Sequence, residues 1–364
     1  MAASDTPPTA RPGDDDALEA AEDAGLRYVH DDDPGFGRRR IGGGFVYVNA
    51  HGHRIADPRT LGRIERLAIP PAYERVWICS DPLGHLQATG RDARGRKQYR
   101  YHPRWRTVRD EAKFARMAAF GRALPAIRER VEADLRRHSL CHEKVIATVV
   151  SLLEATLIRV GNDEYARDNG SFGLTTLRNR HVTASGERLM FEFKGKSGVT
   201  RRIGLRNRRL ARIVRALHDL PGQRLFQWVD ADGARHQVGS ADVNAYLHEI
   251  TGEAFTAKDF RTWAGTIAAA KALALQPAPA SEAEAKRLTA LCVKATAGLL
   301  GNTPAVCRSA YIHPAVIEAF SAGTLPARFA DAEGEAYEAA VLNFLDALAA
   351  PVSPAARSGR AASG

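Results

Sequence analysis

Apolar residues change their spacing at Pro103, and this change constrains the fold of the 364-residue chain more than any other feature. Before Pro103, short apolar or alternating runs lie between Gly, Pro and Asp residues, which is typical of β-strands. After it, apolar residues recur every three or four positions, which is typical of amphipathic helices. The sequence therefore predicts an α+β protein, with a small N-terminal antiparallel β-sheet domain followed by a mainly α-helical domain.

The strands expected in the N-terminal domain are 44–49, 74–79, 85–89 and 97–102. In the helical domain, a three-stranded antiparallel sheet is expected from 181–183, 189–193 and 199–203, with its second hairpin turning at Lys196-Ser197-Gly198. The expected helices are 108–124, 125–140, 143–158, 207–218, 240–251, 258–274, 282–299, a short one from Pro304, and 333–349. Ser281, with Glu284 three residues later, predicts a capped start for 282–299.

Composition indicates where the domains begin and end. Residues 1–27 are acidic, rich in Pro and Ala and without an apolar face, which predicts a disordered tail. We place the N-terminal β-sheet domain at 28–106, the helical domain at 107–350 and a second disordered tail at 351–364.

Charge is distributed unevenly along the chain. The formal net charge is +10, but residues 1–33 hold ten acids against two arginines, so the remainder carries +18. A folded part this basic favours a polyanionic partner. No apolar run approaches the roughly 18 residues that span a bilayer, and the N-terminus lacks the basic and apolar parts of a secretory signal. The four cysteines are far apart, which argues against a disulfide framework and a zinc site. We expect a cytoplasmic protein with no membrane partner.

Two arginine-rich clusters are the candidates for nucleic-acid contacts. The first, 91–109, carries a net charge of +7 in 19 residues and interleaves Tyr99, Tyr101 and Trp105. Basic side chains reach phosphates, while aromatic side chains pack against sugars and donate hydrogen bonds. The second cluster, 201–215, has seven arginines and no acid. Two clusters in separate domains would suit a clamp around a duplex, and a solvated charged surface is the alternative interpretation.

Five short motifs contain residues suited to chemistry on a phosphate. They are Ile158-Arg159-Val160-Gly161-Asn162, Phe193-Lys194-Gly195-Lys196, Lys258-Asp259-Phe260-Arg261-Thr262-Trp263, Leu300-Gly301-Asn302-Thr303-Pro304 and Arg308-Ser309-Ala310-Tyr311. Taken singly, an Arg, Lys or Tyr in such places is more often structural. Together and in this order, the motifs resemble the active-site motifs of type IB DNA topoisomerases, with the short poxvirus and bacterial branch as the best match. The segment 95–101 resembles the DNA-contacting segment of that branch, and the resemblance covers roughly 40–325.

The resemblance implies relaxation of supercoiled DNA. One strand would be cleaved through a 3′-phosphotyrosyl intermediate, the duplex would swivel, and the strand would be rejoined without ATP or metal. Tyr311 would be the nucleophile, Arg159 and Arg261 would bind the non-bridging oxygens, and Lys196 would protonate the leaving 5′-oxygen. Asn302 stands where poxvirus enzymes carry histidine, and its amide can still donate to a phosphate oxygen.

The expected partner is double-stranded DNA, held by a monomer that closes as a clamp in the nucleoid. The expected DNA-binding residues are Arg96, Lys97, Gln98, Tyr99, Arg100, Tyr101, Tyr165, Lys258, Arg201 and Arg202. The chain has no G-x-x-x-x-G-K-[ST] loop, and we interpret the acids at 14–16 and 31–33 as disordered-tail residues rather than a metal site. No cofactor, nucleotide or metal is therefore expected.

Two other functions stay open. A tyrosine recombinase shares the expected fold and the Arg/Lys/Arg/Tyr set, but recombinases typically carry His at the position of Lys258. A non-enzymatic DNA-packaging protein would explain the charge but not the ordered motifs. Relaxation of a plasmid without a recombination site separates the first alternative from a topoisomerase.

Overall fold

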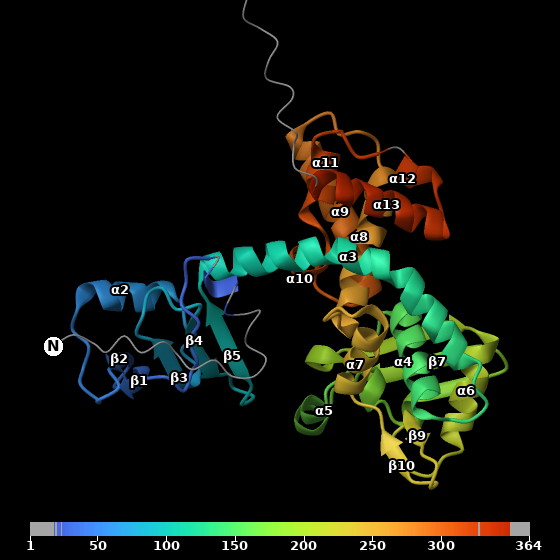
Figure 1. Ribbon diagram of the computed structural model, residues 1–364. Coiled ribbons are helices and arrows are strands. Elements are labelled where there is room, and N and C mark those ends of the chain that lie inside the picture. The colour runs from blue at the N-terminus through green and yellow to red at the C-terminus, as the bar shows by residue number, and fades with distance from the viewer. Residues whose placement is uncertain (1–17, 19, 23, 327, 350–364) are drawn as a thin grey trace, which may run out of the picture. The chain divides into compact units, whose positions relative to one another are not determined.

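The computed structural model describes residues 18, 20–22, 24–326 and 328–349. The chain forms two compact units, Met1–Lys113 and Phe114–Gly364 (Figure 1). The expected boundary after residue 106 and this division fall in the same helix, α3 (Pro103–Leu135). The change of period at Pro103 therefore marks the start of the helix that links the two units.

A five-stranded antiparallel sheet forms the first unit, with strand order β2-β1-β3-β4-β5. Its strands are β1 (Gly35–Ile41), β2 (Gly44–Val48), β3 (Glu74–Cys79), β4 (Leu86–Arg91) and β5 (Lys97–Tyr101). The sequence pattern predicts β2 to β5 but not β1, because the Gly-Phe-Gly-Arg-Arg-Arg-Ile sequence of β1 lacks alternating apolar residues. Its pairing with β2 and β3 makes it a strand.

One face of this sheet packs against a helix. Ile78 and Ala88 are paired on β3 and β4, and they share a buried cluster with Ile64 of α2 (Pro58–Arg66). Successive residues of a strand point to opposite faces, so the residues next to Ile78 and Ala88 in the sequence point away from α2.

The second face is covered by the residues that precede β1. Thr89 Oγ1 donates to the carboxylate of Asp31 at 3.0 Å, and Trp77 Nε1 donates to the backbone oxygen of Asp33 at 2.8 Å. Both donors belong to the row of side chains that points away from α2. These contacts correct our interpretation of the acids at 31–33 as disordered-tail residues.

The packed part of the first unit begins earlier than the sequence predicts. Ala21 and Leu26 are 1% and 5% exposed and form a buried cluster with Trp105. The described residues between 20 and 26 are thus ordered by a contact with a residue about eighty positions away, which no local pattern could indicate. The remaining residues of the two expected tails, 1–17, 19, 23 and 351–364, lie outside the described residues, as do 327 and 350 of the second unit.

Helix α3 runs through Pro125, where the sequence predicts the start of a second helix. A proline inside a helix removes a hydrogen bond, and its ring presses on the carbonyl of the residue four positions earlier. That residue is Gly121, and a β-carbon there would lie 2.6 Å from the indole ring of Trp263. The close packing of α3 on Trp263 offsets the cost of the proline and keeps the helix continuous.

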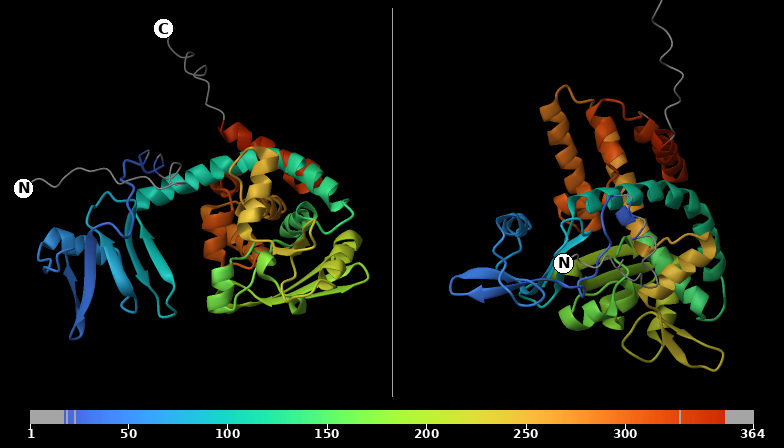
Figure 2. Two further views of the ribbon diagram at one scale, coloured as in Figure 1. Left: turned by 60° about the horizontal axis from the view of Figure 1, so that its bottom comes forward. Right: turned by 60° about the vertical axis from the view of Figure 1, so that its left-hand side comes forward.

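The second unit combines helices with a three-stranded antiparallel sheet of order β6-β7-β8 (Figure 2). Its strands, β6 (Val182–Ser185), β7 (Arg188–Lys194) and β8 (Thr200–Arg206), lie where the sequence predicts them. The hairpin β9 (Gln227–Val229) and β10 (Arg235–Gln237) was not expected. Short 3₁₀ helices are η1 (Leu174–Thr176), η2 (Asn179–His181) and η3 (Lys196–Gly198).

The α-helices are α4 (His142–Thr156), α5 (Asp163–Asn169), α6 (Arg208–His218), α7 (Ser240–Thr251), α8 (Ala257–Ala274), α9 (Glu282–Leu300), α10 (Pro304–Tyr311), α11 (Pro314–Ser321), α12 (Arg328–Asp331) and α13 (Gly334–Ala349).

The observed architecture confirms the expected α+β class. The capped start of α9 is present, since Ser281 Oγ accepts from the backbone N–H of Glu284 at 3.2 Å. All four cysteines are free thiols. Within the described ranges, no helix combines the length and apolar character needed to cross a membrane.

Candidate active site

Arg159 lies in a tight loop after α4. The residue that caps the helix, Leu157, has a left-handed backbone at φ 55°. The Arg159 backbone oxygen accepts from the N–H of Leu174 at 2.9 Å, which ties the loop to η1. Gly173 makes this approach possible, because a β-carbon there would lie 2.5 Å from that oxygen and 2.6 Å from Gly161. The hydrogen bond to Leu174 and the close packing of Gly173 therefore fix the backbone from which the Arg159 side chain extends.

Arg261 lies on α8 and is only 3% exposed. Its Nη1 donates to the backbone oxygen of Leu157, and its Nη2 donates to that of Leu300 at 2.8 Å. The Nε atom is buried without a hydrogen-bond partner among the described residues. Burial lowers the pKa of Arg261, and the like charge of Arg159 lowers it further. A buried cation beside a second cation needs an anion to balance it.

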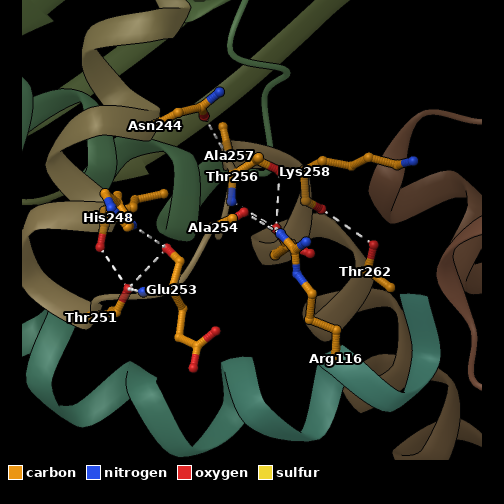
Figure 3. A network of polar contacts seen from close by, with 12 residues as sticks. Arg116, Asn244, His248, Thr251, Glu253, Ala254, Thr256, Ala257, Lys258 and Thr262 are labelled. Atoms are coloured by element: carbon orange, nitrogen blue, oxygen red, sulfur yellow. Dashed lines mark hydrogen bonds and ion pairs between the residues drawn. The ribbon is translucent and has the colours of Figure 1, made fainter. Parts of the chain in front are cut away.

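Figure 3 shows the contacts that hold the start of α8 in place. The backbone N–H of Thr256 donates to the Asp259 carboxylate at 2.7 Å, which caps the helix. Arg116 of α3 donates to the backbone oxygen of Ala254 and pairs with Asp259 at 3.5 Å. The Lys258 side chain extends away from these contacts and is exposed. The network fixes the helix that carries Arg261, one turn further on.

Tyr311 is the last residue of α10 and packs directly on α8. Its backbone oxygen accepts from Thr266 Oγ1 at 3.3 Å. A β-carbon at Gly265 would lie 2.5 Å from that oxygen and 3.0 Å from the Tyr311 Cβ, so only glycine leaves room for the tyrosine. The Arg261 guanidinium carbon lies 5.2 Å from the centre of the Tyr311 ring.

The electrostatic surroundings of Tyr311 favour the phenolate. Burial alone raises the pKa of a phenol, but the charges of Arg261, Arg159 and Lys258, with a hydrogen bond from Arg261, more than offset it. The pKa of Tyr311 is therefore lowered from its usual value. This is the direction that activates a tyrosine as a nucleophile.

Asn302 follows the left-handed Gly301 that ends α9. Arg159 Nη2 donates to its Oδ1, and the backbone N–H of Asn302 donates to Ala297 at 3.0 Å. The Nδ2 atom is buried and has no hydrogen-bond partner among the described residues. The side chain is thus held by one end and keeps a free donor at the other.

Lys196 lies at the expected hairpin tip, in η3 between β7 and β8. Gly195 N–H donates to the Val199 oxygen at 2.8 Å, and Gly198 adopts φ +79°, which closes the turn. The lysine is exposed and has no hydrogen bond or ion pair within the described part of the chain. Direct contacts thus join Arg159 to Asn302 and Arg261 to Tyr311. The charge of Arg159 acts on both Arg261 and Tyr311, which brings the two pairs into one cluster, and Lys196 is not tied to it.

The alternation of β5 divides the expected DNA-binding segment between two faces. Lys97, Tyr99 and Tyr101 share one face, and the rings of the two tyrosines are stacked 6.0 Å apart. Gln98 and Arg100 point to the other face, where Arg100 donates to the backbone of the loop after α2. One surface of the sheet cannot present all of these side chains at once.

Carboxylates engage three of the side chains in the segment 95–101. Asp92 accepts from Arg96 Nε at 2.8 Å and from Gln98 Nε2 at 3.0 Å. The hydrogen bond from Arg96 lowers the pKa of Asp92 to about 2. Lys97 pairs with Asp31 at 2.5 Å. Asp92 therefore holds the β4–β5 turn together through hydrogen bonds, and Asp31 forms an ion pair with the ammonium group of Lys97.

The other expected DNA-binding residues lie in the second unit. Lys258 and Arg202 are exposed, and Arg202 pairs with Glu192 at 3.3 Å. Arg201 is half-buried and lies beside the cluster around Tyr311, a position that its charge alone did not indicate. Tyr165 belongs to α5, and its side chain lies outside the described residues.

Comparison with known proteins identifies the family. Residues 102–326, more than half of the chain, match the family model described as the catalytic core of eukaryotic DNA topoisomerase I. Residues 44–92 match the N-terminal domain of bacterial DNA topoisomerase IB. The chain belongs to the type IB DNA topoisomerases. This topoisomerase is 32% identical to DNA topoisomerase 1B of Acanthamoeba polyphaga mimivirus over 293 residues, which cover 79% of the chain and 87% of the relative.

Poxvirus enzymes are also similar to this topoisomerase. The DNA topoisomerase 1B of Vaccinia virus (strain Copenhagen) is 24% identical over 252 residues, 68% of the chain and 75% of the relative. DNA topoisomerase 1 of Rabbit fibroma virus is 24% identical over 260 residues, with the same coverage. The family decides between the functions left open by the sequence: the protein is an isomerase that relaxes supercoiled DNA through a phosphotyrosyl intermediate, and the DNA-packaging alternative falls away.

Proposed function

We propose that Tyr311 attacks a phosphodiester of duplex DNA while Arg159, Arg261 and Asn302 bind the phosphate and Lys196 protonates the leaving oxygen. One observation carries this assignment. The buried donors Arg261 Nε and Asn302 Nδ2 have no partner among the described residues. Arg261 lies against the Tyr311 ring, and Asn302 is hydrogen-bonded to Arg159. Buried donors are normally satisfied, so these two call for an anionic ligand.

The chemistry follows from the charges in the cluster. The Tyr311 oxygen forms a bond to phosphorus at the 3′ end of the broken strand as the bond to the 5′-oxygen breaks. Negative charge grows on the non-bridging oxygens during this step, and two guanidinium groups with the Asn302 amide stabilise it. The phenolic proton must leave before or during attack, and the lowered pKa of Tyr311 favours that loss.

Lys196 is assigned to the leaving group. An alkoxide is a poor leaving group unless it is protonated, and an exposed lysine on a hairpin can approach DNA bound to the cluster. In the reverse step the 5′-hydroxyl returns its proton to Lys196 and attacks the phosphotyrosyl bond. The phosphotyrosyl ester retains the energy of the phosphodiester, so we propose that neither ATP nor a metal ion takes part.

We further propose that the enzyme is a monomer that closes as a clamp in the cytoplasm on nucleoid DNA. Each unit carries one arginine-rich cluster, 91–109 in the first and 201–215 in the second, and this distribution supports contacts on both sides of a duplex. We also propose that the second unit shares the fold of tyrosine recombinases. Its helices, its three-stranded sheet and its Arg/Lys/Arg/Tyr set support that relation.

Plasmid relaxation tests the assignment. The wild-type protein should relax a supercoiled plasmid that lacks any recombination site, in EDTA and without ATP. Tyr311→Phe should form no covalent DNA adduct and should bind DNA with nearly unchanged affinity, because only the nucleophilic oxygen is lost. Activity that disappears in EDTA would contradict the metal-free mechanism, and an adduct formed by Tyr311→Phe would exclude Tyr311 as the nucleophile.

A further inference from the structure

Arg201 and Arg202 are neighbours in the same arginine cluster, and the structure places them on opposite faces of β8. Every second residue of β8 points inward, so Arg201 shares the inner row with Ile203 and Leu205. Arg202 points outward and pairs with Glu192. A charge at an inward position of a strand is unusual, because the row normally packs in the core.

Two glycines make room for the Arg201 side chain. A β-carbon at Gly301 would overlap Nη1 and Cζ of Arg201, so the guanidinium lies directly against the Gly301 backbone. A β-carbon at Gly195 would lie 3.1 Å from the Arg201 Cγ. Gly195 precedes Lys196 and Gly301 precedes Asn302. The side chain therefore runs between the two loops that carry these residues.

The Arg201 charge has no carboxylate partner among the described residues. The neighbouring charge that acts on it is Arg159, and burial together with that like charge lowers the pKa of Arg201. In turn, the charge of Arg201 contributes to the lowered pKa of Arg261. Three guanidinium groups gathered without an acid repel one another, and an anion placed between them removes that cost.

We propose that Arg201 is a third guanidinium of the active site, which binds a non-bridging oxygen of the phosphate that Tyr311 attacks. This proposal rests on the assignment of Tyr311 as the nucleophile. It separates Arg201 from Arg202, which contributes to DNA binding only through its charge. Because the guanidinium lies between the Lys196 hairpin and the Asn302 loop, a bound phosphate would also draw these two loops together.

Arg201→Gln and the matched variant Arg188→Gln test the proposal, since each removes one positive charge from the same three-stranded sheet. Single-turnover cleavage of a suicide DNA substrate at saturating enzyme should slow roughly 10²- to 10³-fold for Arg201→Gln, the range for loss of one transition-state donor. Arg188→Gln should cleave at the wild-type rate once saturated, because its side chain is exposed and lies outside the proposed active site and both arginine clusters. Circular dichroism checks that both variants are folded.

A methylphosphonate at the cleavage site distinguishes a phosphate contact from support of the loops. This group replaces one non-bridging oxygen by methyl and removes the charge that Arg201 would neutralise. The penalty of Arg201→Gln should therefore shrink on that substrate. Wild-type cleavage by saturated Arg201→Gln, or an equal penalty on both substrates, would overturn the proposal. Tyr311→Phe run in parallel reports separately on the nucleophile.

Discussion

Arg261 combines a permanent charge with an exposure of only 3%, and two backbone oxygens accept its Nη donors. Removing an ion from water costs several kcal/mol even after the protein relaxes. In most proteins a carboxylate offsets that cost, but here the neighbouring charges are Arg159 and Arg201. The residues of the cluster are therefore arranged for a ligand that brings its own negative charge, and the same field acts on the Tyr311 hydroxyl.

The lowered pKa of Tyr311 predicts how cleavage depends on pH. The phenolate is the reactive form, so the rate should rise with pH and level off below the ordinary tyrosine value of about 10. Lys258→Gln removes one of the charges that lower this pKa, and its midpoint should move to higher pH. A substrate with sulfur at the 5′-bridging position isolates this titration, because its leaving group needs no acid.

Lys194→Gln is the control for the pH profile. Lys194 is exposed on β7 and is not among the charges that lower the pKa of Tyr311, so its midpoint should match the wild type. If the midpoint of the pH profile is the same in Lys258→Gln and the wild type, the Lys258 charge does not act on the nucleophile.

Lys196 has the sharpest chemical test. Lys196→Ala should slow cleavage of normal DNA by roughly 10²- to 10⁴-fold, the usual scale for general acid catalysis. On the 5′-bridging sulfur substrate Lys196→Ala should recover most of its cleavage rate. Arg261→Lys should not recover, because the proposed role of Arg261 is to bind the phosphate. Equal losses of Lys196→Ala on both substrates would assign the acid role to another residue, such as Lys194 or Arg159.

Among the helices, α8 organises the site. It packs against α9 and α10, and it carries both Arg261 and the glycine on which Tyr311 rests. Its start is fixed by the Asp259 cap and by Arg116 of α3. Contacts between helices, rather than a single loop, therefore set the separation of the arginine and the tyrosine.

Gly265→Ala tests this packing. The added methyl would lie 2.5 Å from the Tyr311 backbone oxygen, so α8 and α10 must separate. We expect a loss of about 1–3 kcal/mol of unfolding free energy, the usual cost of overpacking, together with slower cleavage. Gly298→Ala is the control, because no atom lies within 4 Å of its added methyl and alanine favours a helix by about 0.5–1 kcal/mol. Denaturant unfolding measures both changes, and equal stabilities would contradict the close contact.

On the scale of the whole molecule, the uneven charge has a structural counterpart. Residues 1–33 carry a net charge of −8, and the rest of the chain carries +18. Asp31 of this acidic segment lies on a face of the first unit's sheet, where it accepts a hydrogen bond from Thr89. Asp31 pairs with Lys97, one of the expected DNA-binding residues. We therefore propose that the acidic segment competes with DNA for the Lys97 ammonium group.

Asp31→Asn should therefore bind duplex DNA a few-fold more tightly at low salt, with the difference shrinking as salt screens the charges. Glu65→Gln, on α2 at the opposite face of the same sheet, changes the net charge equally and should have a smaller effect. Fluorescence anisotropy over a range of salt concentrations measures both. Equal increases in DNA affinity for Asp31→Asn and Glu65→Gln would show that net charge alone, and not the ion pair with Lys97, causes the tighter binding.

The sequence by itself determined the class of the fold, most helices and strands, and the residues of the candidate site. Strand and helix periods are local, since each records which side chains of a segment face the core. Helix α7 accordingly begins and ends where the pattern predicts, at 240 and 251. The candidate site residues Arg159, Lys196, Arg261, Asn302 and Tyr311 came from the order of the five motifs and their resemblance to type IB topoisomerases, since each residue taken singly indicates little.

Only the tertiary structure decided what depends on distant contacts. It made β1 a strand by pairing with β3, kept α3 continuous through Pro125, and packed Ala21 and Leu26 against Trp105. It also separated Arg201 from Arg202, which have the same charge and adjacent positions. A local pattern cannot encode these outcomes, because the partners lie tens to more than a hundred residues apart and meet only when the chain has folded.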